Sequence, residues 1–265
     1  MYKFLALDLD DTLLGKDLII PPTTVAKLRA LQASGVGVTL ATGRMFPSAR
    51  FYAKQLGLTL PLVTYNGAII RAAESDTPFI AHLLPTDKMR QVITCCKEHQ
   101  WYLQFYNDDQ IIVEKITDET RIDPDLLNAP ALEVGDFLKS DIKPSPKMMT
   151  VQKPEDIHRV KAILEEATGE NLYIAGSKPY LLEIMSKNVS KAVALSELIG
   201  KLGIDRSEVI AIGDSSNDME MVKWAGLGVA VGNAKDELKA AADHITKAPR
   251  SQGIEELIDH LFPSI

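Results

Sequence analysis

The apolar positions along the first part of the chain alternate between the patterns of buried strands and of amphipathic helices. Strands are expected at residues 3–9, 36–41 and 61–70, the last with a break at Asn66-Gly67. Helices are expected at residues 47–56 and from Pro22 to a stop at Gly35, with Val25, Leu28 and Leu31 on one face. Strands that are continuously apolar and separated by helices are typical of a parallel sheet that helices cover on both faces.

The middle of the chain follows a different pattern, which mixes helices with hairpins. A helix is expected at residues 86–99, because Met89, Val92, Ile93 and Cys96 have the spacing i, i+3, i+4, i+7. Asn107-Asp108-Asp109 is a hairpin signal between two apolar runs. A further helix is expected at 155–167, and strands at 147–152, 171–177 and 180–187.

The first pattern returns after about residue 187. Helices are expected at 191–202, 235–242 and 252–261, and strands at 208–214 and 226–233. The sequence therefore predicts an α/β protein with a Rossmann-like parallel-sheet core, residues 1–82 and 187–265, which is interrupted by an inserted α+β domain at residues 83–186.

Polar residues follow the predicted core strands where each strand ends. These residues are Asp8, Asp10, Thr42, Asp214, Asn217 and Asp218, together with Lys191 at the start of a helix. Because parallel strands bring their carboxyl ends to one edge of the sheet, we expect these side chains to lie close together. A set rich in carboxylates suits a hard cation, above all Mg²⁺, whereas the scattered histidines lack the spacing of a zinc site.

This set of residues can support phosphoryl chemistry. An aspartate can attack phosphorus to give an aspartyl phosphate, while Mg²⁺ and a lysine neutralise the developing charge. The hydroxyl and the backbone N–H groups at Thr42-Gly43 can hold phosphate oxygens. Taken singly, each residue has a plainer explanation, such as a turn or a helix cap. Tyr65-Asn66-Gly67 is interpreted as a structural turn and not as part of a ligand site.

These residues resemble the four motifs of the haloacid dehalogenase superfamily. D-L-D-D-T at 8–12 matches its D-x-D-x-T motif, and L-A-T-G-R at 40–44 is similar to its second motif. Lys191 matches the third motif, although Ala192 stands where the family often has glycine, and G-D-S-S-N-D at 213–218 matches the fourth. The whole chain looks most like the Cof-type hydrolases of subclass IIB, so the inserted domain corresponds to their cap domain.

The resemblance implies a role for each matching residue. Asp8 would be the nucleophile and a Mg²⁺ ligand, and Asp10 the general acid and base, which gives the metal only its backbone carbonyl. Asp214 would ligate Mg²⁺ with support from Asp218, and Arg44 would touch either the substrate or a cap carboxylate. The phosphate would be bound by Leu9, through its backbone N–H, and by Thr42, Gly43, Lys191 and Asn217.

The resemblance therefore implies a Mg²⁺-dependent phosphatase that hydrolyses a small phosphorylated metabolite, such as a sugar phosphate, through an aspartyl phosphate. A phosphomutase and a non-catalytic phosphate-binding regulatory protein on the same scaffold remain alternatives. Dehalogenation is disfavoured because the dehalogenase branch lacks the second motif aspartate, which is present here as Asp10. The inserted domain and the position of D-x-D-x-T argue against a signalling receiver module.

Composition narrows the expected partners and location. The 265-residue chain has a formal net charge of −7 and no block of lysine or arginine, which disfavours nucleic acid as a partner. Its two cysteines, Cys95 and Cys96, are adjacent, which fits a reducing compartment. We find no signal-peptide pattern and no apolar run as long as a membrane span. We therefore expect a cytoplasmic protein without a membrane partner, whose oligomeric state the sequence leaves open.

Overall fold

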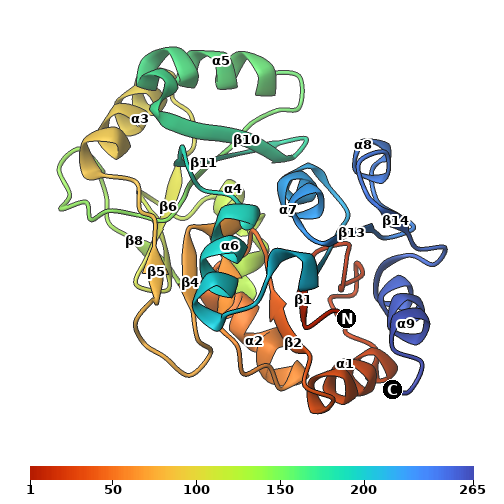
Figure 1. The fold of residues 1–265 in the computed structure, drawn as a ribbon. Helices are drawn as coiled ribbons and strands as arrows, with labels where there is room; N and C mark the ends of the chain where they lie inside the picture. The colour runs from red at the N-terminus through yellow and green to blue at the C-terminus, as the bar shows by residue number, and fades with distance from the viewer. The chain divides into compact units, whose positions relative to one another are not determined.

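The computed structural model describes residues 1–265, apart from the side chains of Pro124, Glu170 and Ser177. The chain folds into two compact units (Figure 1). Unit 1 comprises Met1–Arg44, Ala49–Ile80 and Ser190–Ile265, and unit 2 comprises Met45–Ser48 and Ala81–Val189. Most of unit 2 is therefore inserted between two long segments of unit 1.

Unit 1 is built on a five-stranded parallel sheet with the order β14-β13-β12-β1-β2. Its strands are β1 (Phe4–Leu7), β2 (Gly37–Leu40), β12 (Val209–Gly213), β13 (Leu227–Ala230) and β14 (His244–Ile245). Every residue of β1 and β12 is buried, as their uninterrupted apolar sequences predict for strands covered on both faces. The predicted α/β class with a parallel core sheet is confirmed.

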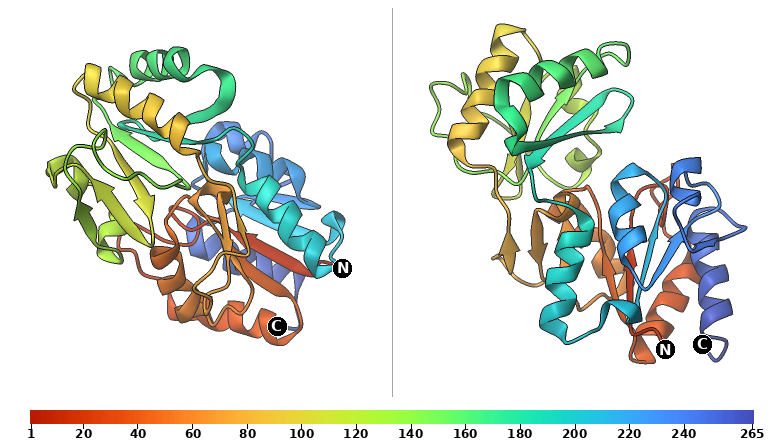
Figure 2. Two further views of the ribbon diagram at one scale, coloured as in Figure 1. Left: turned by 90° about the vertical axis from the view of Figure 1, so that its left-hand side faces the viewer. Right: turned by 45° about the horizontal axis from the view of Figure 1, so that its top comes forward.

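Helices cover both faces of this sheet (Figure 2). They are α1 (Pro22–Ala33), α2 (Phe46–Leu56), α6 (Lys191–Leu202), α7 (Met219–Trp224), α8 (Asp236–Lys239) and α9 (Arg250–Leu261). Helix α1 packs against α9 on one face, and α6 packs against α7 on the other. In α1 the core positions are Thr24, Leu28 and Leu31, so Thr24 occupies the place predicted for Val25, which is only half-buried.

The strand expected over residues 61–70 does break at Asn66-Gly67, but it is two strands, because the chain reverses at Tyr65–Gly67. Strands β3 (Leu62–Thr64) and β4 (Ile69–Arg71) pair antiparallel and, with β5 (Ile80–Ala81), form a separate three-stranded sheet. A parallel bridge between Ala41 and Val63 continues the core sheet into β3. Both arms of the hairpin are buried, so the apolar run continues on both sides of the turn and does not show that the two arms pair with each other.

Unit 2 contains a six-stranded sheet with the order β10-β11-β9-β6-β7-β8. Its strands are β6 (Gln104–Asn107), β7 (Gln110–Val113), β8 (Ala131–Glu133), β9 (Met148–Val151), β10 (Leu172–Lys178) and β11 (Leu181–Ser186). The predicted hairpin joins β6 to β7, and Asp108 and Asp109 adopt the positive φ values of 47° and 59° that its tight turn requires.

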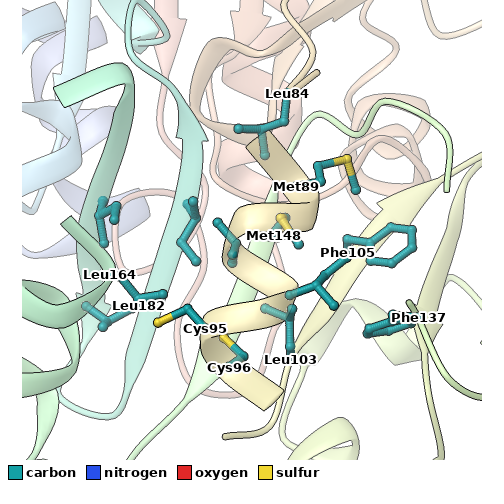
Figure 3. Close-up of a cluster of buried hydrophobic side chains, with 14 of the residues drawn as sticks. Leu84, Met89, Cys95, Cys96, Leu103, Phe105, Phe137, Met148, Leu164 and Leu182 are labelled. Carbon is teal, nitrogen blue, oxygen red and sulfur yellow. The ribbon is translucent and has the colours of Figure 1, made fainter. Parts of the chain in front are cut away.

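Two helices, α3 (Thr86–Glu98) and α5 (Ile157–Thr168), contribute to the hydrophobic core of unit 2 (Figure 3). The core includes Met89 and Cys96 from α3, Leu164 from α5, and Phe105 and Met148 from the sheet. Cys95 and Cys96 are both buried in this cluster as reduced thiols. Unit 2 therefore has a core of its own.

The elements that the sequence did not predict are short. They include β5, β8, β14, the single-turn helix α4 (Asp118–Arg121) and short 3₁₀ turns such as Pro124–Leu127. Segments of two to four residues are too short to show a helical or strand period, so sequence periodicity cannot identify them. Across the described residues, no helix combines the length and the apolar character that crossing a membrane requires.

Candidate functional site

Three motif carboxylates meet at the carboxyl edge of the parallel sheet of unit 1. Asp8 follows β1 and Asp214 follows β12, and these two strands are neighbours in the sheet. Asp218 lies in the 3₁₀ turn Ser216–Asp218 that follows Asp214. One carboxylate oxygen of each residue lies within 4.8 Å of the other two. Residues separated by 200 positions in sequence are thus brought together by strand pairing.

Lys191 lies between two of these carboxylates. Its Nζ is 2.6 Å from Asp8 Oδ1 and 2.6 Å from Asp218 Oδ1, and only 1% of the residue is exposed. It is the first residue of α6, where the side chain of Ser190 caps the helix by accepting from the Val193 N–H. Burial lowers the pKa of Lys191, but Asp218 and Asp8 outweigh it and the pKa is raised, so the side chain stays an ammonium.

Asp218 uses both of its oxygens for contacts within the protein. Oδ1 binds Lys191, and Oδ2 accepts from the backbone N–H groups of Asp214 at 3.0 Å and Ser215 at 3.1 Å. Gly213 lies directly against this carboxylate, since a Cβ there would be 2.4 Å from Asp218 Cγ. The Asp218 side chain therefore shapes the loop that carries Asp214, which leaves Asp8 and Asp214 better placed to bind a ligand.

The cluster carries more negative charge than its lysine balances. Burial, and then repulsion by Asp218, raises the pKa of Asp8 well above its usual range despite the opposing effect of Lys191. The same two causes raise the pKa of Asp214 to about 7. All the candidate ligands in this cluster are carboxylate oxygens, which fits a hard divalent cation such as Mg²⁺.

Asp10 makes a two-pronged ion pair with Arg44. Arg44 donates from Nε to Asp10 Oδ2 at 2.8 Å and from Nη2 to Oδ1 at 2.6 Å. The arginine is buried and also lies over the ring of Tyr52, whereas the Asp10 side chain is 48% exposed. From the sequence, Arg44 is expected to contact either the substrate or a cap carboxylate. Its contact with Asp10 is not among these expectations. The pair fixes the direction of the Asp10 carboxylate.

Asp11, the third acid of the D-L-D-D-T motif, contacts residues near the far end of the chain. Its carboxylate accepts from Arg250 Nη2 at 2.7 Å, and its backbone carbonyl accepts from Asn233 Nδ2 at 2.8 Å. Leu9 is fully buried, and its carbonyl accepts from the N–H groups of Leu13 and Leu14. These contacts hold the loop after β1, which carries Asp10, in a tight turn.

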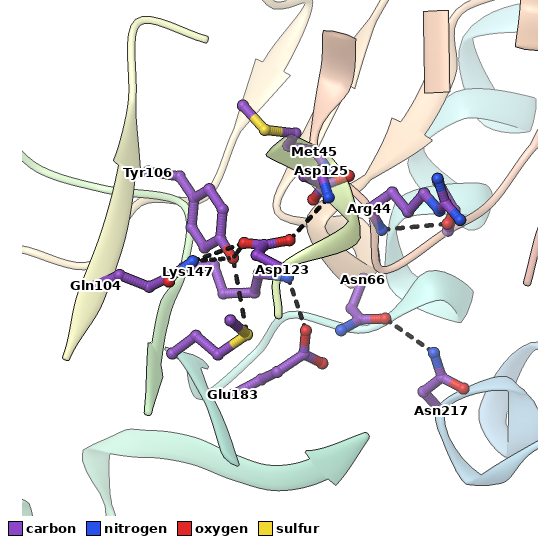
Figure 4. Close-up of polar contacts among 12 residues, drawn as sticks. Arg44, Met45, Asn66, Gln104, Tyr106, Asp123, Asp125, Lys147, Glu183 and Asn217 are labelled. Carbon is purple, nitrogen blue, oxygen red and sulfur yellow. Dashed lines mark hydrogen bonds and ion pairs between the residues drawn. The ribbon is translucent and has the colours of Figure 1, made fainter. Parts of the chain in front are cut away.

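The phosphate-binding candidates of the second and fourth motifs meet at Asn66 (Figure 4). The Asn66 N–H donates to the Thr42 carbonyl at 2.9 Å, and Asn217 Nδ2 donates to Asn66 Oδ1 at 3.1 Å. Gly43 packs against the same side chain, since a Cβ there would be 2.9 Å from Asn66 Oδ1. Asn66 is thus part of this site. The sequence signal that could have identified it is an Asn-Gly turn directly after a strand that ends at the same edge.

Unit 2 contains a second buried polar cluster that the sequence did not indicate (Figure 4). Asp123 Oδ2 accepts from Gln104 Nε2 at 2.6 Å and from the Tyr106 hydroxyl at 2.7 Å. Lys147 Nζ donates to Glu183 Oε1 at 2.7 Å, and both side chains are buried. These residues are far apart in sequence and match no motif that links them.

Asp125 belongs to the same cluster and contacts the backbone of the segment Met45–Ser48, which is also part of unit 2. Its Oδ2 accepts from the Met45 N–H at 3.0 Å. Burial, and then repulsion by Asp123, raises the pKa of Asp125 to about 7, although Lys147 opposes the shift. Unit 2 therefore places three carboxylates and one ammonium in a small buried region.

Comparisons with known proteins find the same family of hydrolases over nearly the whole chain. A family model described as haloacid dehalogenase-like hydrolase matches residues 5–258. A 5-amino-6-(5-phospho-D-ribitylamino)uracil phosphatase of Bacillus subtilis (strain 168) is 30% identical over 97% of this chain and 97% of its own length.

Solved structures give the same result. A haloacid dehalogenase-like hydrolase from Bacteroides thetaiotaomicron has a TM-score of 0.91 at 30% identity, covering 99% of this chain and 100% of its own. A sugar phosphatase of subclass IIB of the superfamily has a TM-score of 0.83 at 26% identity, with coverage of 99% and 100%.

The raised pKa of Asp214 predicts a pH-dependent stability. Because the pKa is about 7 in the folded protein and near 3.8 for an ordinary aspartate, the folded state binds more protons between these values. Stability should therefore fall as the pH rises from about 4 to 7. In EDTA, the thermal midpoint of the wild type should fall relative to that of Asp214→Asn across this window. A constant difference between the two proteins would contradict the prediction.

The buried pair in unit 2 predicts a stability effect of its own. Lys147→Met removes the ammonium from Glu183 and should cost about 3–5 kcal/mol in urea unfolding, as expected when one partner of a buried ion pair is lost. The control is Lys147→Met with Glu183→Leu, which removes both charges and should recover most of the loss. Equal destabilisation by the single and the double variant would show that the charge pair is not the cause.

Proposed function

Because this chain belongs to the haloacid dehalogenase-like hydrolases, we propose that it is a Mg²⁺-dependent phosphatase acting on a small phosphorylated metabolite through an aspartyl phosphate. Its relatives include phosphatases of this superfamily, and the order of its motifs predicts the same class. The observation that carries the proposal is the Asp8 carboxylate, held 2.6 Å from Lys191 among three acids at the sheet edge.

In the proposed reaction Asp8 is the nucleophile. One of its oxygens forms a bond to phosphorus, and the bond between phosphorus and the leaving oxygen breaks, which gives an aspartyl phosphate. Water then attacks the phosphorus, the bond to Asp8 breaks, and inorganic phosphate is released. The carboxylate is well anchored for attack, because its backbone N–H donates to the Ile212 carbonyl and Lys191 holds Oδ1.

Asp10 is proposed to move the protons. It gives a proton to the leaving oxygen in the first step and takes one from the attacking water in the second. Both of its oxygens accept one hydrogen bond from Arg44 in the structure, and each oxygen keeps a further lone pair that can take up a proton. The half-exposed Asp10 side chain has room to turn, and Arg44 then serves as the anchor that returns it.

The transferring phosphoryl group is proposed to lie beside Lys191. Its ammonium, the Thr42 hydroxyl, the Asn217 amide and the backbone N–H groups of Leu9 and Gly43 are the proposed donors to the phosphate oxygens. Lys191 is the motif cation and stabilises the charge that develops there. Its two carboxylate partners fix the ammonium, so little reorganisation is needed during the reaction.

Asp8, Asp214 and the backbone carbonyl of Asp10 are the residues proposed to hold Mg²⁺. When bound, the ion neutralises charge on the carboxylates and on the phosphoryl oxygens. Asp214 is held by the Thr12 hydroxyl at 3.4 Å, and the loop that carries it is held by Asp218. The high pKa of Asp214 is consistent with a ligand whose charge is balanced only when a cation is present.

Unit 2 is proposed to act as the cap domain, which selects the substrate. It has its own hydrophobic core and a buried polar cluster, as expected of a separate domain that contributes recognition rather than chemistry. One relative is named for a ribitylaminouracil phosphate and another as a sugar phosphatase. We therefore propose a phosphomonoester of a sugar or a similarly small polar metabolite.

Turnover of an aryl phosphate tests the proposed function directly. The protein should release the aryl alcohol with Mg²⁺, lose this activity after exhaustive EDTA treatment, and regain it when Mg²⁺ is restored. Circular dichroism should show an unchanged fold throughout. Full activity after chelation would contradict the metal requirement, and no turnover with Mg²⁺ would contradict the phosphatase proposal itself.

Substitution of the two neighbouring aspartates should separate their roles. Asp8→Asn should abolish turnover, because an amide is a very poor nucleophile. Asp10→Asn should still bind Mg²⁺ and should slow turnover by about 10²–10⁴-fold, the usual contribution of a general acid and base. With a good leaving group it should release a burst of aryl alcohol before slow turnover.

A metal titration is the control for the Asp10 assignment. Asp214→Asn should weaken Mg²⁺ binding much more than Asp10→Asn, because only Asp214 is proposed to use its side chain on the metal. Equal losses of affinity would make the Asp10 side chain a ligand.

A further inference from the structure

We propose that the turn Tyr65–Gly67 is a positioning element of the phosphate site, and that Asn66 strengthens phosphate binding by orienting the amide of Asn217. This inference rests on the proposed function, since it requires that Asn217 bind phosphate. It adds to that function a residue that lies outside the four motifs.

The backbone of this turn is strained in a way that its contacts must maintain. Tyr65, Asn66 and Gly67 have consecutive positive φ values of 51°, 54° and 106°. For a bulky residue such as Tyr65 this conformation is rare and strained. The Tyr65 N–H donates to the Arg44 carbonyl at 3.0 Å, and the Asn66 N–H to the Thr42 carbonyl at 2.9 Å. The turn is thus bound to the loop of the second motif.

The same turn contacts the start of the helix that carries Lys191. A Cβ on Gly67 would lie 2.3 Å from the carbonyl oxygen of Ser190, so the two backbones are in direct contact. Ser190 is the N-cap of α6, and Lys191 is its first residue. Three residues therefore touch the segments of the second, third and fourth motifs, the last through the side chain of Asn66.

The side chain of Asn66 determines which end of the Asn217 amide is available. Asn217 Nδ2 donates to Asn66 Oδ1 at 3.1 Å, and Asn217 Oδ1 accepts from the Ser215 hydroxyl at 2.8 Å (Figure 4). An amide nitrogen has two hydrogens, so one hydrogen of Nδ2 remains for a phosphate oxygen. Both polar ends of the Asn217 side chain are thereby fixed.

Loss of Asn66 should therefore weaken phosphate binding by a specific route. Without the acceptor Oδ1 of Asn66, the Asn217 amide keeps only its contact with the Ser215 hydroxyl. A hydroxyl can donate to Oδ1 or accept from Nδ2, so the amide can then turn its carbonyl oxygen toward the phosphate. A carbonyl oxygen accepts hydrogen bonds and repels the anion, so the donor would be lost for part of the time. The effect should appear in phosphate affinity and should require Asn217.

The decisive experiment compares Asn66→Gly, Asn217→Ala and the double variant. Glycine tolerates the positive φ of this position, so Asn66→Gly removes the side chain without adding backbone strain. The inhibition constant of inorganic phosphate should rise about 10-fold in Asn217→Ala, as for loss of a hydrogen bond to a charged group. It should rise several-fold in Asn66→Gly and no further in the double variant than in Asn217→Ala. Thermal unfolding verifies that each variant is folded.

Asn66→Asp supplies the matched control, and it also serves if Asn66→Gly fails to fold. Aspartate is nearly the same shape and keeps the acceptor for Asn217. Removing Asn217 in the Asn66→Asp background should still cost the full factor in phosphate affinity, whereas in the Asn66→Gly background it should cost only the part of that factor that Asn66→Gly has not already cost. Additive effects in the Asn66→Gly cycle, or wild-type phosphate affinity in Asn66→Gly, would overturn the inference.

The wild-type protein separates this inference from the proposed function. If it neither hydrolyses aryl phosphate nor is inhibited by inorganic phosphate, the proposed function fails. If it does both and Asn217→Ala weakens phosphate inhibition while Asn66→Gly does not, only the role of Asn66 fails.

Discussion

The ammonium of Lys191, buried between Asp8 and Asp218, is the interaction on which the site depends. Burial raises the pKa of Asp8 and would by itself lower that of Lys191, and each of these two groups offsets part of the effect of burial on the other. The lysine stays an ammonium because two carboxylates contact it. Removing the lysine would leave the buried acids without a compensating charge, so the site depends on this side chain.

The acids at this edge of the sheet differ in their surroundings, and these differences suit them to different roles. Both carboxylate oxygens of Asp218 are bound, one by Lys191 and the other by two backbone N–H groups, so Asp218 supports the loop that carries Asp214. Asp214 keeps a high pKa and is only partly buried, which suits a side chain that meets a cation. Asp10 lies outside the lysine cluster and is held by Arg44. Four carboxylates within one edge of a sheet thus have distinct environments.

Much of the core and of this edge could be predicted because parallel strands impose their own geometry. Once β1 and β12 are recognised as buried parallel strands, Asp8 and Asp214 are expected at the same edge of the sheet, and the observed pairing of the two strands places them side by side. The turn at Tyr65–Gly67 could be predicted, but the hairpin that it forms could not, because the apolar pattern is the same on both sides of a buried hairpin. The role of Asn66 depends on one side-chain contact with Asn217, and such contacts leave no periodic trace in the sequence. The polar cluster of unit 2 could not be predicted for the same reason, since its members come from strands and loops that are far apart in sequence.

The pairing of β1 has a consequence for the order in which the protein can form. The strand lies between β2 and β12, and β12 starts at Val209, so the first strand has only one of its two neighbours until most of the chain has been synthesised. The ion pair between Asp11 and Arg250 can form only after an even longer part of the chain has been synthesised. Unit 2 ends at Val189 and carries a complete core, so during synthesis it is able to fold first. The sheet of unit 1, which carries the proposed nucleophile Asp8, can be completed only after β12 has been synthesised. The candidate site can therefore assemble only in chains that are nearly complete.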